Sequence, residues 1–161
     1  MAPEWPVRRA DATEIPALAR LWAEIWRASH ASISPPELIR LRTQASFHDR
    51  LAAMGERLRV AGPAGAPIGF CAVREGEIYQ LFVSQAEQGS GLARLLLEDG
   101  EARLRAAGTK LAILDCSIGN HRATRFYEKC GWRLRGEEMI ALETSEGPLP
   151  LLTRIFEKRL A

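Results

Sequence analysis

Gly89 and Gly91 lie in a segment whose residue types suit the binding of an anionic ligand. The segment reads Val83-Ser-Gln-Ala-Glu-Gln-Gly-Ser-Gly-Leu-Ala-Arg94 and lies between an apolar strand-like run and a long amphipathic helical pattern. The two glycines allow a ligand to approach the backbone without a Cβ in the way. A helix that begins at about Ser90 offers unpaired N–H groups and the positive end of its dipole. The segment therefore predicts a site for a phosphate or pyrophosphate group.

Three phosphate-binding patterns can be compared with this segment. A P-loop requires Lys followed by Ser or Thr after its second glycine, whereas Gly91 is followed by Leu-Ala-Arg. The dinucleotide fingerprint G-x-G-x-x-G requires a third glycine, but the chain has Arg94 at that position. In that fold the first glycine also follows its strand at once, whereas here five residues separate Val83 from Gly89. Asp115 stands near the place of the ribose-binding acid of that fold, so a dinucleotide-binding domain is kept as a weaker alternative.

The third pattern, Arg/Gln-x-x-Gly-x-Gly/Ala, fits the chain from Gln88 to Ala93. A second pattern, Asn-x-x-Ala-x-x-Phe-Tyr-Glu-Lys-x-Gly-Phe, fits residues 120–132, with Trp132 in place of the final Phe. Both resemble patterns of the GNAT acetyltransferase superfamily, and together they cover about residues 77–135. The resemblance implies an N-acetyltransferase that moves an acetyl group from acetyl-CoA to a primary amine, by direct attack through a tetrahedral intermediate.

The resemblance also implies which residues bind acetyl-CoA, the cosubstrate. A backbone N–H near Phe82 or Val83 is the implied oxyanion donor, and Asn120 caps a helix while bonding the cofactor arm. Arg94, Arg122, Arg125 and Lys129 could contact the 3′-phosphate. A protein of this fold could instead bind acyl-CoA as a sensor or assembly module without transfer. The implied cofactor-binding residues are Phe82, Val83, Gln88, Gly89, Ser90, Gly91, Leu92, Ala93, Arg94, Asn120, Ala123 and Tyr127.

Acyl transfer to an amine requires a neutral amine, a stabilised oxyanion and a proton for the leaving thiolate. Tyr127 matches the tyrosine that faces the thioester sulfur in the family, and a phenol with a pKa of about 10 is protonated at neutral pH. Glu77 is the first candidate for the general base, acting through water, and Asp115 is the second.

Cys116 and His121 could pair as nucleophile and base in a covalent mechanism. No acid that would orient the histidine is evident, and direct transfer needs no acyl-enzyme. Cys116 is therefore expected to be a packed thiol.

The acceptor is expected to be a small-molecule amine or a peptide amine. We expect it to be cationic, because acidic side chains stand on the sheet and near the last hairpin, where they could attract a positive charge. These acidic residues are Glu77, Asp115, Glu138 and Glu143.

Length and composition place the chain among globular proteins. Its 161 residues suffice for a full core, so residues 1–161 are expected to form a single domain. The net charge of +2 is too small to indicate nucleic-acid binding, and no apolar run is long enough to predict a membrane span.

No secretory signal is recognised, so a cytoplasmic location is expected. The three cysteines are widely spaced and indicate neither a disulfide framework nor a metal site. A homodimer is compatible with the sequence.

Hydrophobic periodicity and turn residues predict the order of the elements. The strand–helix–strand unit from 77 to 115 implies parallel pairing, whereas the other strands are expected to pair antiparallel. On its helix, Arg94, Glu98, Glu101 and Arg105 are expected to face water, and His30–Ser34 is expected to be a surface loop. The predicted fold class is α/β, a single mixed, twisted, mostly antiparallel sheet flanked by helices, as in GNAT proteins. Helices are predicted at 15–29, 36–54, 90–107 and 121–130, and strands at 57–61, 68–73, 77–83, 110–115, 132–135 with 138–142, and 149–156.

Overall fold

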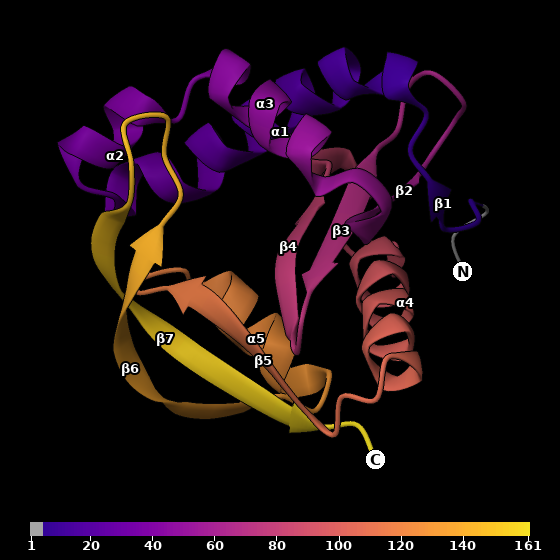
Figure 1. Cartoon of the computed structure of the whole chain (residues 1–161), viewed down its shortest axis with the longest axis vertical. Helices are drawn as coiled ribbons and strands as arrows, with labels where there is room; N and C mark the ends of the chain where they lie inside the picture. The colour runs from indigo at the N-terminus through magenta and orange to yellow at the C-terminus, as the bar shows by residue number, and fades with distance from the viewer. Residues whose placement is uncertain (1–4) are drawn as a thin grey trace.

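One open, twisted sheet of seven strands organises the computed structural model, which describes residues 5–161 (Figure 1). The strand order is β1-β2-β3-β4-β5-β7-β6, and every neighbouring pair runs antiparallel except the parallel pair β4 and β5. The predicted fold class is confirmed, and this topology does not fit the parallel, doubly wound sheet of the dinucleotide-binding alternative. The strands are β1 (Arg8–Arg9), β2 (Leu58–Ala61), β3 (Gly69–Arg74), β4 (Glu77–Val83), β5 (Leu111–Ser117), β6 (Arg133–Leu142) and β7 (Leu149–Arg159).

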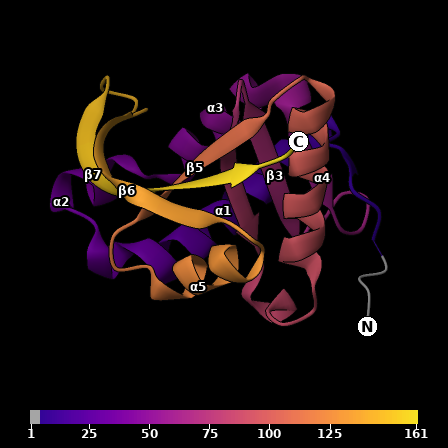
Figure 2. The same cartoon turned by 90° about the horizontal axis from the view of Figure 1, so that it is seen from below.

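Helices cover both faces of the sheet (Figure 2). On one face, α1 (Ile15–His30) and α3 (Gln44–Met54) pack around the buried rings of Trp22, Phe47 and Phe70. On the other face, α4 (Leu92–Ala106) and α5 (His121–Lys129) bury Leu96, Leu97 and Phe156. Apolar residues at helical spacing give each of these helices one stripe that packs on the sheet, buried in α1, α3 and α4 and partly buried in α5, which explains why these elements could be predicted from the sequence.

Glu14 ties the amino-terminal segment to the sheet. Its side chain is 2% exposed, and it accepts hydrogen bonds from both terminal nitrogens of Arg8, at 2.8 Å each. The backbone N–H groups of Asp11 and Gly65 also donate to it, at 2.8 and 2.9 Å. The Arg8 guanidinium, aided by these N–H donors, lowers the pKa of Glu14 to about 2. Asp11 in turn caps the short turn Ala12–Glu14 that precedes α1.

The helix predicted from Pro36 to Met54 is in fact two helices, α2 (Pro36–Leu41) and α3. Arg42 leaves the helical region with ψ 69°, and Thr43 is extended with ψ 162°. The Thr43 hydroxyl accepts a hydrogen bond from the Ser46 N–H at 3.1 Å, which caps α3. Threonine favours a cap over a helix interior because its hydroxyl bonds nearby backbone groups. The break turns Arg42 toward the interior of the protein, where it is 5% exposed.

The pairing of β3 with β4 contains one register shift, which inserts Tyr79 as an extra residue on β4. Regular alternation along the strand predicted at 77–83 would place Glu77 and Tyr79 on one face with Leu81 and Val83. This prediction is wrong, because the bulge reverses the alternation: Tyr79 packs on the α1 side of the core, whereas Leu81 and Val83 pack on the α4 side.

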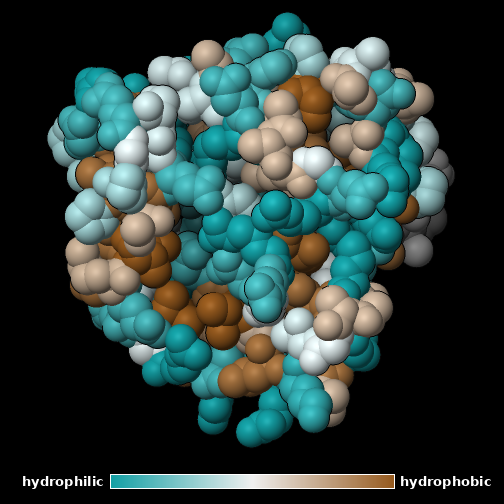
Figure 3. Space-filling model, viewed as in Figure 1, coloured by the Kyte–Doolittle hydropathy of each residue, from teal (hydrophilic) through white to brown (hydrophobic). Residues whose placement is uncertain are grey.

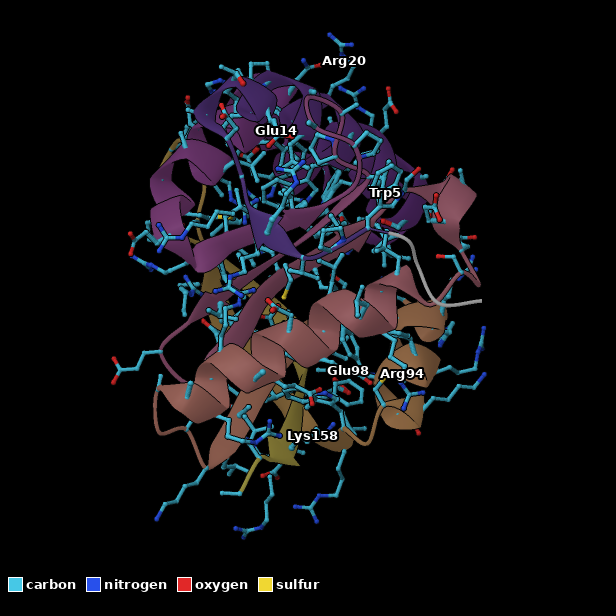
Figure 4. All side chains as sticks on the ribbon, turned by 90° about the vertical axis from the view of Figure 1, so that its right-hand side faces the viewer. Trp5, Glu14, Arg20, Arg94, Glu98 and Lys158 are labelled. Atoms are coloured by element: carbon cyan, nitrogen blue, oxygen red, sulfur yellow. The ribbon has the colours of Figure 1, made fainter. Side chains whose placement is uncertain are left out.

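Glu101 on α4 is buried, 5% exposed, instead of facing water as predicted. Its carboxylate accepts hydrogen bonds from the Lys158 ammonium at 2.8 Å and from the Trp132 indole at 3.0 Å. Figure 4 shows Lys158 beneath α4, at the end of β7. Both partners follow Glu101 by more than thirty positions, so the local pattern around it held no sign of this cluster.

The outer strands β6 and β7 form a long antiparallel pair, and β6 is one strand with a bulge instead of two pieces. Apolar side chains gather over this pair at the left of Figure 3, where Met139 is 63% exposed and Leu152 opposite it is 44% exposed. Among residues 5–161, no helix is long and apolar enough to cross a membrane.

Candidate active site

The parallel strands β4 and β5 touch at one point and then diverge (Figure 1). Glu77 pairs with Ile113, and the Ile113 N–H donates to the Gly76 carbonyl at 3.0 Å. At the other end of β4, the Ser84 N–H donates toward β3, to the Ile68 carbonyl at 2.8 Å. Hydrogen-bonding direction alternates along an antiparallel strand, so the backbone groups of Leu81 and Val83 point away from β3 and into the gap. The gap exposes strand-edge donors and acceptors inside the protein.

A cleft of about 940 Å³ occupies this gap and extends beneath α1 and α2. Most residues predicted to bind acetyl-CoA line it: Phe82, Val83, Gln88, Gly89, Gly91, Ala93, Arg94, Asn120, Ala123 and Tyr127. Ser90 and Leu92 do not. The Ser90 hydroxyl instead donates to the Glu87 carbonyl at 2.7 Å, and the Leu92 side chain is fully buried in the core. Neither side chain is therefore available to a ligand in the cleft.

The loop before α4 has the backbone shape of an anion cradle. Gly91 is the N-cap of α4, which therefore begins at Leu92 and not at Ser90, and it adopts the left-handed conformation with φ 90°. Gly89 is also left-handed, with φ 80°. A side chain at either position would be strained, which explains the two glycines. Cationic side chains of α4 and α5 line the same end of the cleft: Arg94, Arg122, Arg125 and Lys129. This donor set fits a ligand that carries several phosphates.

Tyr127 of α5 lines the cleft. Its ring packs against Phe126, Trp132 and Phe156. Among residues 5–161 the hydroxyl has no hydrogen-bond partner, and burial raises the pKa of Tyr127 above its usual range. The phenol is therefore a protonated donor at neutral pH. Asn120 holds the start of α5, since its side-chain oxygen accepts the Ala123 N–H at 3.2 Å.

The two candidate bases have different surroundings. The Glu77 carboxylate accepts a 2.6 Å hydrogen bond from Arg74 and does not line the cleft. Asp115 lines the cleft and forms no ion pair with any residue of the described chain. Burial, together with the negative charge of Glu77, raises the pKa of Asp115 to about 6. A carboxylate with that pKa is ionised at neutral pH yet basic enough to take a proton, so the geometry favours Asp115 over Glu77.

Cys116 also lines the cleft but lacks the features of a nucleophile. Burial raises the pKa of its thiol to about 11, so the thiolate is scarce at neutral pH. His121, its suggested partner, does not line the cleft. Within residues 5–161, no group of His, Cys, Asp and Glu side chains is arranged to hold a metal ion.

The cleft residues that the sequence analysis did not assign to a site include His30, Arg42 and Arg50. His30 ends α1 instead of starting a surface loop, and its ring stacks on Trp26 with centroids 5.6 Å apart. Burial, with the charge of Arg42, lowers the pKa of His30 to about 4, so the ring is neutral. One signal was available, because Arg50 falls on the buried stripe of α3 between Phe47 and Met54.

Comparison with known proteins identifies the relatives of this arrangement. Residues 15–132 match the sequence model of the family described as "Acetyltransferase (GNAT) family". A stretch of 57 residues is 44% identical to part of the mycothiol acetyltransferase of Streptosporangium roseum. The matched stretch makes up 35% of this chain and 17% of that protein.

Several solved structures share the fold of the whole chain. One is a protein from Rhodopseudomonas palustris that is described both as a GCN5-related N-acetyltransferase and as an aminotransferase of class II. Its TM-score is 0.77 at 18% sequence identity, and the match covers 99% of this chain and 98% of that one. Another is the PaiA N-acetyltransferase of Thermoplasma acidophilum in complex with coenzyme A, with a TM-score of 0.69, 16% identity, and coverage of 98% and 99%. A third is YncA of Salmonella typhimurium with its cofactor acetyl-CoA, with a TM-score of 0.71, 17% identity, and coverage of 99% and 95%.

Proposed function

The chain belongs to the acetyltransferase (GNAT) family, and from this premise we propose that it transfers an acetyl group from acetyl-CoA to a primary amine. One observation carries the proposal: a single cleft joins the left-handed loop at Gly91, the free strand edge of β4 and Tyr127, whose hydroxyl has no hydrogen-bond partner among residues 5–161. Each feature meets one requirement of acyl transfer from a thioester. We also propose that residues 1–161 act as one catalytic domain.

The cradle and the strand edge hold the cosubstrate in this proposal. Backbone N–H groups at the start of α4 and the nearby cationic side chains bind its phosphates. The backbone groups of Leu81 and Val83 that point into the gap bond its amides and stabilise the oxyanion. Acetyl-CoA, when bound, supplies the activated thioester.

Asp115 and Tyr127 handle the protons. Asp115, ionised above pH 6, accepts a proton from the incoming ammonium group, directly or through water. Tyr127 donates its phenolic proton to the departing thiolate. Direct attack of the amine on the thioester then needs no covalent enzyme intermediate, in keeping with the poorly ionised thiol of Cys116. Glu77 is retained as a weaker candidate base, because Arg74 already engages its carboxylate.

The experiment is a thiol-release assay with acetyl-CoA and a panel of amines, run beside calorimetry of cofactor binding. The proposal expects acetyl-CoA to bind and thiol release to depend on the added amine. Binding without release for every amine would instead support a sensor or assembly module. Absence of acetyl-CoA binding to the folded protein would refute the proposal.

A further inference from the structure

The cleft has a second part that the cofactor-binding residues do not reach, beneath α1, α2 and α3. Its walls are largely apolar and include the side chains of Trp26, Leu38, Leu142 and Leu151. Two arginines, Arg42 of the α2–α3 break and Arg50 of α3, line this apolar part. The acceptor must enter here, because the loop before α4 and the gap between β4 and β5 belong to the cosubstrate in the proposed reaction.

Arg42 is buried and forms no ion pair with any of residues 5–161, although the more distant charge of Glu143 acts on it. It is 5% exposed, and its guanidinium donates to the backbone carbonyl of Glu143 at 2.6 Å. In the described chain no carboxylate lies within ion-pairing distance of it. Burial, together with the positive charge of Arg50, lowers the pKa of Arg42 to about 10, which still leaves it charged at neutral pH. A buried charge without a partner is costly, and a ligand of opposite charge would relieve that cost.

Arg50 is held in place but is also short of acceptors. Its guanidinium lies over the Trp22 ring, 4.6 Å from the centroid, and donates to the Tyr79 hydroxyl at 3.3 Å. Its Nε is buried and has no hydrogen-bond partner in the described structure. The stacking on Trp22 fixes the plane of the guanidinium, which prepares its fork for a planar anion.

The acidic residues that the sequence suggested for the acceptor are engaged elsewhere. Arg74 binds both Glu77, at 2.6 Å, and Glu143, at 2.7 Å. Glu138 pairs with Arg135 at 2.8 Å on the outer surface. Of those four carboxylates, Asp115 is the one that lines the cleft. The acceptor part of the cleft therefore carries a net positive charge, contrary to the expected attraction of a purely cationic amine.

We propose that the acceptor is an amine that also carries a carboxylate, with an apolar body between them, such as an apolar amino acid. The inference rests on the proposed transfer reaction. The carboxylate is bound by Arg42 and Arg50, the apolar body packs against the walls of the cleft, and the amine is directed toward Asp115. Arginine forks match the two oxygens of a carboxylate, and an apolar enclosure strengthens such pairs.

The test compares matched ligands on the unmodified protein. Phenylalanine and leucine are compared with their carboxamides and with the corresponding amines that lack the carboxyl group, by thiol release and by calorimetry in the presence of coenzyme A. The inference expects kcat/KM and affinity to be at least tenfold higher for the acids. Equal values for acid and carboxamide, or no binding of either acid, would overturn it.

Arginine variants locate the effect. Arg42→Gln and Arg50→Gln should each raise KM for the acids at least tenfold while changing kcat little, and should abolish the preference over the carboxamides. Arg50→Lys keeps the positive charge but lacks the planar fork, so it replaces a glutamine variant in the test if that variant does not fold. Arg20→Gln, on the exposed surface of α1 (Figure 4), is the matched control and should behave as the unmodified protein does. An acid preference that survives in folded Arg42 and Arg50 variants would place carboxylate recognition elsewhere.

Failure of the function and failure of this inference give different results. If the acids bind at least tenfold more tightly than the carboxamides but no thiol is released, the binding site stands and the transfer reaction is refuted. If amines without a carboxylate are acetylated as well as the acids, the reaction stands and the inference is refuted.

Discussion

Two carboxylates, the buried Glu101 and the partly buried Asp115, lie on opposite faces of the sheet and have opposite surroundings. Glu101, beneath α4, accepts hydrogen bonds from the Lys158 ammonium and the Trp132 indole, and Lys158 also donates to the Cys130 carbonyl at 2.8 Å. Asp115, in the cleft, has no ion-pair partner among residues 5–161 and a pKa raised to about 6. A buried charge that has a partner within the protein is costly to unpair, whereas a charge without such a partner is available to a ligand or a proton.

The same difference separates the arginines. Arg103 on α4 is bound by Asp99 at 3.0 Å and donates to two backbone carbonyls, at 2.8 and 3.1 Å. Arg42 and Arg50 line the cleft and pair with no carboxylate in the part of the chain that the structure describes. Substitutions in the cleft should therefore affect turnover or binding, and substitutions beneath α4 should affect stability.

The largest effect is expected for Tyr127→Phe, which removes the hydroxyl and keeps the ring. If the phenol protonates the leaving thiolate, kcat should fall about a hundredfold to ten-thousandfold. The dissociation constant of acetyl-CoA and the melting temperature should change little, because the ring contacts with Phe126, Trp132 and Phe156 persist. All three quantities are measured on one preparation. A variant with full kcat would remove Tyr127 from the mechanism.

Glu101→Ala should produce the largest loss of stability. It leaves the Lys158 ammonium and the Trp132 indole without their acceptor, and breaking a buried pair of this kind costs about 3–5 kcal/mol. Denaturant unfolding measures the change, and kcat of the folded fraction should be normal. The control is Glu98→Ala on the exposed side of α4, whose pair with Arg94 at 3.1 Å is worth less than about 1 kcal/mol. Equal losses for the two variants would contradict the comparison.

Asp115→Asn should increase the stability of the protein, in contrast to Glu101→Ala, while it lowers the rate of turnover. The folded pKa of about 6 lies above the ordinary 3.8, so the folded state binds more protons and stability falls as pH rises between these values. Removing the carboxylate should therefore stabilise the protein at neutral pH, by about 1–3 kcal/mol.

Kinetic measurements on the same variant test whether Asp115 is the general base. In the unmodified enzyme kcat/KM should rise with pH through about 6, as Asp115 ionises. In Asp115→Asn that rise should disappear and the rate should be about a hundredfold lower. An unchanged pH profile would transfer the role to another group, and Glu77→Gln is the next variant to examine.

Gly91→Val tests the cofactor end of the cleft and carries the smallest predicted effect. Valine is strained at φ 90° and places a side chain where the phosphates must approach, so acetyl-CoA affinity should fall more than tenfold, about 1.4 kcal/mol or more. Gly108→Val is the matched control, because Gly108 has φ 93° but lies past the far end of α4. Equal affinities in both variants, when folded, would end the assignment of the cradle.

Local patterns predicted most of the fold because its helices and strands carry their own periodicity. The break at Thr43 and the bulge at Tyr79 were missed, since each replaces a regular continuation by a local hydrogen bond or an extra residue. The motif segments from Gln88 to Arg94 and from Asn120 to Tyr127 could be recognised in the sequence because each is contiguous, and most of the residues predicted from them line the cleft. Arg42 and the burial of Glu101 were not, because their contacts join segments far apart in the chain.

The single contact between β4 and β5 has a consequence for amide hydrogen exchange. Along β4, the N–H groups that bond β3 are protected by the sheet, whereas those of Leu81 and Val83 face the gap. Deuterium uptake should therefore alternate along the strand in the free protein, fast at Leu81 and Val83 and slow at Phe82 between them. Bound acetyl-CoA should slow the fast positions and leave Phe82 unchanged, giving a record of cofactor binding at single-residue resolution without any chemical turnover.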